Sequence, residues 1–279
     1  MRLQKWLLVK LVALAGVLAS VSTNYCGAGE TGPPANLEIS VDASRPIAVA
    51  LDLLEQRHGV AITYEDPRYA HESDIADVTD RVRRDSGGNP EGTHPRVLIP
   101  RHGRLHVIYV MRGKTSQLDD IAAVIRLLLE AHAEQRLPGG FRMERSGTLF
   151  HVVPIAVKGE DGGLVEAGSV LDAKIDLLKE ERTGLETLEA ICAALHQVTG
   201  EHVVLGLTPL NWLIDRRVSV GASDEAARAV LGRVLAGIEP SMSWSWRLFY
   251  DPGLKWHVLN LYVVPKMHES MPSAGKDQP

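Results

Sequence analysis

The chain has 279 residues, of which 45% are hydrophobic and 23% charged, and its formal net charge is −5. These values are typical of a globular protein with a buried core and argue against a disordered chain. The negative charge disfavours a nucleic-acid partner, because phosphate binding normally needs a basic surface. The length allows one large domain or two small ones.

The amino terminus has the layout of a secretory signal peptide over residues 1–22. Arg2, Lys5 and Lys10 accompany a short apolar run that is followed by small residues. We therefore expect a periplasmic or secreted protein with no membrane span after removal of the leader. An uncleaved anchor is disfavoured because Lys10 would lie inside the span. Loss of the three cations would bring the net charge to about −8.

The two cysteines do not predict a disulfide scaffold. Cys26 follows the leader closely, but the bulky Tyr25 before it disfavours lipid attachment. Cys192 falls on the apolar side of a predicted helix, where a lone cysteine usually serves as a small apolar side chain.

The stretch 39–66 predicts a strand, a helix and a second strand. "LEISVD" alternates apolar and polar residues, as a half-buried strand does. Ser44 is expected to cap a helix that begins around Pro46, and Gly59 is expected to end it. "VAITYE" then predicts the second strand.

The same order recurs in "TGLETLEAICAALHQVTGEHVVLGL", which covers residues 183–207. Thr183 and Glu186 form a capping-box pattern, and Gly200 closes the helix. Aligning Gly59 with Gly200 places the apolar positions of one helix on those of the other, which indicates an internal repeat. The two apolar stripes are Ile47, Ala50, Leu51 and Leu54 in the first copy, and Leu188, Ile191, Leu195 and Val198 in the second.

Each copy continues with a strand, a helix and a hairpin, and both hairpins end on Val-Val-Pro, at Pro154 and Pro265. We therefore predict an α+β fold with two repeated small modules, each with two helices packed on a small mixed β-sheet. The inward positions expected for these later helices are Leu118, Ile121, Ile125 and Leu128, and Ala227, Val230, Leu231 and Val234.

The domain organisation follows from these copies. The first module carries an insert at 66–104, in which we expect a solvated loop at "RVRRD" and a hairpin around Gly103. The predicted segments are a signal peptide at 1–22, a linker at 23–36, the first module at 37–157, a linker at 158–167, the second module at 168–266 and a disordered tail at 267–279.

The strand "ISVD", the helix ending in Gly59, the strand "VAITYE" and the later "SDEAARAVLGRVLAG" together resemble the secretin and TonB short N-terminal (STN) domain family. The resemblance covers most of both copies. It implies a periplasmic module that contacts another cell-envelope protein and is not an enzyme. Members of that family precede an outer-membrane barrel or a secretin region, neither of which is expected after Pro265.

Three histidines are the candidate metal ligands. His102 and His106 have the spacing of two ligands on one helix turn, with His94 nearby. The expected hairpin around Gly103 would separate their side chains, so we predict no metal site. "RGKT" resembles the end of a phosphate loop, but the required earlier glycine is Ile108, and we predict no nucleotide site and no cofactor.

No constellation of catalytic residues is evident. Two acidic pairs occur, Asp119 with Asp120 and Glu180 with Glu181, and helix starts or charged loops explain both of them.

Tryptophans are the candidate partner-binding residues. Trp244 and Trp246 share the parity of Leu248 and Tyr250 in one predicted strand, and Trp256 lies across the turn. A buried face is the favoured interpretation. If part of the row were exposed, it would be a credible anchor for a partner.

We predict an exported, non-catalytic envelope protein that acts as a protein–protein interaction or adaptor module. The alternative is a small exported enzyme, or a ligand- or metal-binding protein, that uses the insert and the cleft between the modules. The oligomeric state and the partner are left open by the sequence.

Overall fold

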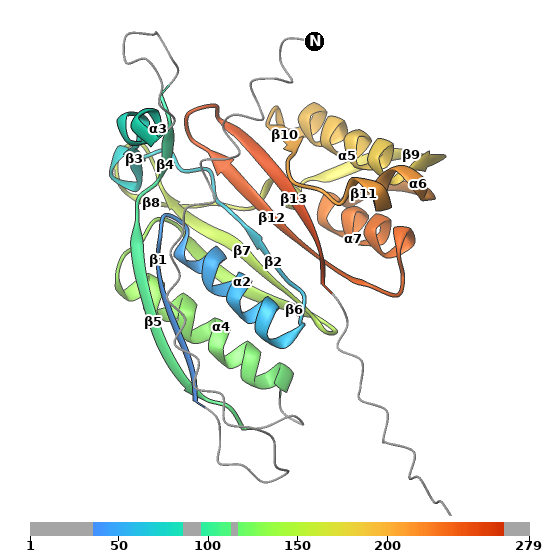
Figure 1. Cartoon of the computed structure of the whole chain (residues 1–279). Helices are drawn as coiled ribbons and strands as arrows, with labels where there is room; N and C mark the ends of the chain where they lie inside the picture. Colours follow the sequence, from blue (N-terminus) through green and yellow to red (C-terminus); the bar gives the residue numbers. More distant parts are fainter. Residues whose placement is uncertain (1–35, 86–95, 113–116, 265–279) are drawn as a thin grey trace, which may run out of the picture.

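The computed structural model describes residues 36–85, 96–112 and 117–264, in which helices and strands are mixed (Figure 1). The predicted leader and tail, with Cys26 and His94, lie outside these ranges. Within them, no helix combines the length and apolarity needed to cross a membrane. We call the described residues up to Glu166 the first half, and those from Ser169 the second half.

The first half begins with the predicted strand–helix–strand order, and the predicted hairpin, β6 with β7, is followed by the short strand β8. Its elements are β1 (Asn36–Ala43), α2 (Pro46–His58), β2 (Ile62–Glu65), the 3-10 helix η2 (Glu72–Asp74), β3 (Ile75–Asp77), α3 (Thr79–Asp85), β4 (Leu98–Pro100), β5 (Gly103–Val110), α4 (Gln117–Glu134), β6 (Gly140–Ser146), β7 (Leu149–Lys158) and β8 (Leu164–Glu166).

The second half also mixes helices and strands, and it ends in a hairpin. Its elements are the 3-10 helix η4 (Val170–Asp172), β9 (Lys174–Thr183), α5 (Gly184–Thr199), β10 (His202–Leu205), α6 (Leu210–Asp215), β11 (Arg217–Ala226), α7 (Ala227–Ile238), β12 (Ser243–Asp251) and β13 (Trp256–Val264).

One seven-stranded sheet runs through both halves. Its strand order is β10-β13-β12-β2-β7-β6, and β8 pairs with β7. The halves join where β12 runs parallel to β2, with Arg247 opposite Tyr64 and Leu248 opposite Glu65. The expectation of a separate small sheet in each module is therefore wrong. The N–H and C=O groups along the second side of β2 need partners, and β12 supplies them.

Two long antiparallel ribbons, β1 with β5 and β9 with β11, and the short antiparallel pair of β3 with β4 complete the framework. The first ribbon has eight regular residue pairs, whereas the second has two register shifts. Each ribbon contacts the two long helices of its own half, namely α2 and α4 or α5 and α7.

Each half has its own hydrophobic core. The predicted inward residues of α7 are buried, as are Ile121, Ile125 and Leu128 of α4, whereas Leu118 is only partly buried. Cys192 belongs to the second core as expected. Val198 departs from its predicted stripe, because its side chain is 58% exposed in the last turn of α5.

The helix ends confirm most of the local predictions. Gly59 and Gly200 have φ of 61° and 73°, the left-handed conformation that glycine adopts without steric cost. Thr183 and Glu186 form the predicted capping box. The expected cap at Ser44 is wrong, because Arg45 occupies the N-cap position and sends its side chain elsewhere.

The insert differs most from expectation. No hairpin forms around Gly103, since β4 pairs with β3 while β5 pairs with β1. A side chain at Gly103 would lie 2.7 Å from Leu137, which explains the glycine as a close approach and not as a turn. "RVRRD" belongs to helix α3 and is not a loop. The predicted linker 158–167 contains β8, which extends the sheet.

Candidate functional site

The contact between the two halves along β2 and β12, which we call the seam, contains most of the buried charge. Trp246 and Arg247 are successive residues of β12, so they point to opposite faces of the sheet. Trp246 belongs to the core of the second half, whereas Arg247 bonds Asp52 of α2. Helices of the two halves therefore lie on opposite faces, and polar groups meet on both.

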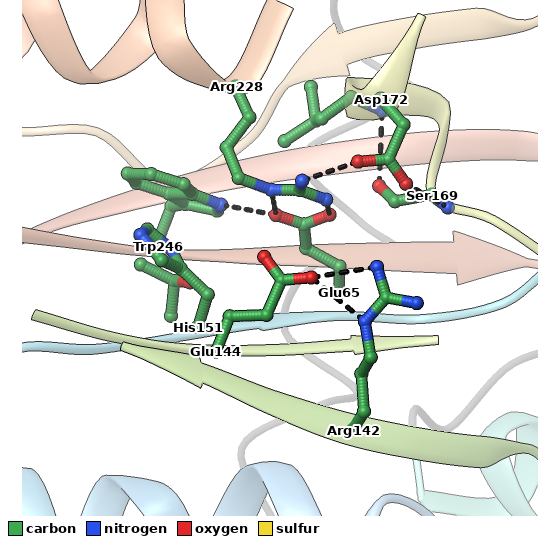
Figure 2. A network of polar contacts seen from close by, with 10 residues as sticks. Glu65, Arg142, Glu144, His151, Ser169, Asp172, Arg228 and Trp246 are labelled. Carbon is green, nitrogen blue, oxygen red and sulfur yellow. Dashed lines mark hydrogen bonds and ion pairs between the residues drawn. The ribbon is translucent and has the colours of Figure 1, made fainter. Parts of the chain in front are cut away.

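On one face, Glu65 at the end of β2 is fully buried and paired with Arg228 of α7 (Figure 2). The Arg228 Nε and NH2 groups donate to Glu65 Oε1 and Oε2 at 2.9 and 2.7 Å. The Trp246 indole N–H donates to Glu65 Oε1 at 3.1 Å. Such a two-pronged guanidinium–carboxylate pair combines strength with a fixed geometry.

Asp172 bonds the same guanidinium from the second half. It is held in place by a capping box with Ser169, whose backbone N–H donates to Asp172 Oδ2 at 3.1 Å. Burial alone would lower the pKa of Arg228, but the hydrogen bonds and charges of Glu65 and Asp172 outweigh it and raise that pKa. Arg228 therefore keeps its positive charge within the cluster.

His151 of β7 lies beside this cluster (Figure 2). Its Nδ1 is 2.8 Å from the hydroxyl of Thr63, and its ring centre is 5.5 Å from that of Trp246. Burial, helped by the charge of Arg228, lowers the pKa of His151 despite the opposing carboxylates of Glu65 and Glu144. These surroundings therefore favour the neutral form of the imidazole.

A second cluster surrounds Asp66, which is 1% exposed. Its carboxylate accepts hydrogen bonds from Arg45 Nε at 2.6 Å, from Tyr64 at 2.7 Å and from Tyr69 at 3.1 Å. It also accepts the backbone N–H of Tyr250 in β12 at 3.0 Å. Burial, followed by the charge of Asp66, raises the pKa of both tyrosines well above the usual value.

A third cluster surrounds Arg247, which is 1% exposed on the opposite face of β12. Its guanidinium lies 2.6 Å from Asp52 of α2 and also donates to the carbonyl of Ile62. Glu55 accepts from the hydroxyl of Ser245 at 2.9 Å. Burial raises the pKa of Glu55, and the charge of Arg247 partly opposes that rise.

These clusters hold the halves together, and their arrangement does not favour acid–base catalysis. Each buried carboxylate of the seam is matched by an arginine, by tyrosine hydroxyls or by backbone N–H groups. A general acid or base must be able to exchange its proton with a substrate, which these fixed ion pairs do not favour.

Outside the seam, the hydroxyl of Ser73 has neighbours that could support a chemical reaction. Ser73 Oγ lies 2.8 Å from His71 Nδ1 and 3.0 Å from Lys158 Nζ. Lys158 also bonds Asp74 at 2.7 Å. A hydroxyl between an imidazole and an ammonium has the partners of an activated nucleophile. The same His71 nitrogen also accepts the Ser73 backbone N–H at 3.1 Å, which is a capping role for η2.

The structure places the predicted tryptophans differently from one another. Trp244 and Trp246 are 6% and 1% exposed, which fits the favoured interpretation of a buried face. Trp256 is partly exposed, and its ring centre lies 5.5 Å from that of His202.

His102 and His106 both lie on the solvent side of the β1–β5 ribbon, where they approach acids of β1. His102 Nδ1 is 2.9 Å from Asp42, and His106 Nδ1 is 3.9 Å from Glu38. Within the described ranges, no three ligand-type side chains gather in a way that could hold a metal ion.

Of the two acidic pairs, Asp119 with Asp120 lies in the first turn of α4 as predicted, whereas Glu180 with Glu181 does not lie at a helix start. Asp120 is fully buried and accepts the backbone N–H of Arg112 at 2.7 Å and the hydroxyl of Tyr109 at 2.9 Å. It therefore ties the end of β5 to α4. Glu180 and Glu181 lie in strand β9 and not in a loop or at a helix start.

Sequence reasoning missed the seam residues Glu65, Asp66, Arg228 and Arg247. The one local signal was the pair of acids directly after the apolar strand "AITY", where buried charge requires a partner. Nothing in the sequence connects Glu65 to Arg228, which lies 163 positions later, or Asp66 to Arg45, which lies 21 positions earlier.

Comparisons of the chain with protein-family models, with curated proteins and with solved structures gave no match.

Proposed function

We propose that the protein is an exported, non-catalytic adaptor built from two copies of one STN-like α+β module, which binds another cell-envelope protein. Strand pairing supports the repeat. β1 with β5 corresponds to β9 with β11, both antiparallel. β2 with β7 corresponds to β10 with β13, both parallel, and the hairpins β6–β7 and β12–β13 correspond as well.

The observation that carries the binding role is an exposed apolar group beside β10, which we call the α6 surface. Its members are Leu207, Leu210 and Ile214, which are 54%, 50% and 52% exposed. Leu210 and Ile214 are four positions apart and share one side of the helix. Clustered exposed apolar side chains often mark contacts with other proteins, whereas the buried charge of the seam is already neutralised.

Site-specific photocrosslinking tests this proposal. A photoreactive amino acid at Leu210 should trap one envelope protein in intact cells, and the same residue at Leu178, which is 70% exposed on β9, should not. Changing Leu210 and Ile214 to Asp should abolish capture at an unchanged melting temperature. Equal capture from both positions, or turnover of ester or phosphoester substrates by the wild-type protein, would count against the adaptor.

The Ser73 group favours a second candidate function, a small exported hydrolase. The expected sign is covalent labelling of Ser73 by a fluorophosphonate, with loss of labelling in both Ser73→Ala and Lys158→Met. If wild-type protein resists the reagent, His71 and Ser73 act only as the cap of η2.

A further inference from the structure

The strand β6 forms one end of the seven-stranded sheet. Among the residues that the structure describes, β6 pairs only with β7, and β8 joins β7 on the side of β2. β10, at the other end of the sheet, has four residues, whereas β6 has seven. A long open edge is a template for pairing with another strand.

The groups on that edge can be identified from the hairpin. The Phe150 N–H donates to Ala61 O at 3.2 Å, toward β2, so Phe150 does not bond its β6 partner Arg145. Hydrogen-bonded and non-bonded pairs alternate in an antiparallel ladder. Phe141, Met143 and Arg145 therefore direct their N–H and C=O groups away from β7. Pro154 opposite Phe141 fits this parity, because proline has no N–H to donate.

The charges of β6 reverse in sign about Met143. Arg142 precedes it and Glu144 follows it, and their side chains bond each other at 2.8 Å on one face of the sheet (Figure 2). Charged side chains on an edge normally oppose pairing. Here an antiparallel copy centred on Met143 would place each Arg142 opposite a Glu144.

We infer that β6 pairs with β6 of a second copy of this chain, antiparallel about a two-fold axis at Met143. The outward groups of Phe141, Met143 and Arg145 then exchange about six hydrogen bonds across the axis. Arg142 and Glu144 occupy the non-bonded pairs, where opposite side chains come closest and opposite charges stabilise. The contact uses the same surface on both copies, as a two-fold dimer requires.

Charge reversal separates this geometry from other modes of association. Arg142→Glu and Glu144→Arg each place like charges opposite one another, so each variant alone should dimerise about ten-fold or more weakly than wild type. An equimolar mixture of the two restores opposite charges and should form a heterodimer. The double variant Arg142→Glu/Glu144→Arg should dimerise like wild type.

Sedimentation of the purified full-length chain over a range of concentrations measures these equilibria. Arg182→Glu is the matched control, because Arg182 pairs with Glu180 two positions away on β9 and should leave the dimer unchanged. Met143→Pro removes one outward N–H without touching the β7 ladder, and it should give a folded monomer. Circular dichroism checks folding in every variant.

A wild-type chain that stays monomeric, or a dimer unaffected by both Arg142→Glu and Met143→Pro, would overturn the inference. Failure of the mixed variants to associate would also overturn it. A monomer whose β6 amides are already protected from hydrogen exchange would likewise overturn it, because another segment of this chain would then pair with β6.

Discussion

Replacing Arg228 with Met should cost the protein about 3–5 kcal/mol of stability, because the buried charge of Glu65 loses its partner. Glu65 is 0% exposed and cannot rehydrate without opening the seam. Asp172 also loses Arg228, but its side chain is 43% exposed, so water can replace that contact at little cost. The loss is a large fraction of the about 5–15 kcal/mol that stabilises an ordinary domain.

Urea unfolding, followed by tryptophan fluorescence and circular dichroism, measures this effect. Because Glu65 and Arg228 come from different halves, the wild-type protein should unfold in one transition, and Arg228→Met should weaken or split it. Adding Glu65→Gln removes the unpaired buried charge and keeps an oxygen that can accept the indole N–H of Trp246. The double variant should therefore recover most of the stability that Arg228→Met loses.

Arg217→Met provides the control, since Arg217 and Glu181 form an ion pair with side chains 56% and 69% exposed. Exposed pairs contribute about 0–1 kcal/mol, so this variant should unfold like wild type. A loss below about 1 kcal/mol in Arg228→Met would refute the reasoning. So would a double variant no more stable than the single one, since stability would then not depend on the unpaired carboxylate.

Three further predictions concern single groups. Burial lowers the pKa of His132 and of His257 to about 4. Between about pH 6.5 and 4 the unfolded chain therefore binds more protons at these residues than the folded chain does. Each histidine should thus remove about 3 kcal/mol of stability as the pH falls through this range. In urea melts across that range, His257→Asn should show a shallower loss than wild type. Burial raises the pKa of Cys192 to about 12, so iodoacetamide should modify it only in guanidinium, and rapid labelling of native protein would contradict this. Thr183→Ala removes the cap of α5 and should cost about 1 kcal/mol, with Thr183→Ser retaining most of it.

Local features of the fold could be predicted from the sequence because their causes are local. Gly59 and Gly200 end helices by their own conformational freedom, and the Thr183 capping box spans four residues. The alternation of "LEISVD" fixes which side of β1 is buried, whatever strand lies beside it.

Predictions that depended on distant partners failed or were not made. β4 and β5 adjoin in sequence around Gly103, but each pairs with a different strand. Ser44 is a good capping residue by type, yet Arg45 occupies the cap because its side chain bonds Asp66. Hydrophobic periodicity carries no information about which strand lies next to β2. The continuous sheet and the seam could therefore not be predicted from the sequence.

The buried charges explain how so short a junction can have one register. β2 and β12 share only two paired positions, which is little backbone to define an alignment. A slip of one residue would turn Glu65 to the face of α2 and leave Arg228 on the other side without its partner. The apolar cores would tolerate such a slip better than these ion pairs would. Separating a buried ion pair leaves a charge that has neither its partner nor water around it. We therefore interpret the seam as the feature that fixes the register, which makes the sheet edge at β6 a surface of defined geometry for a second copy.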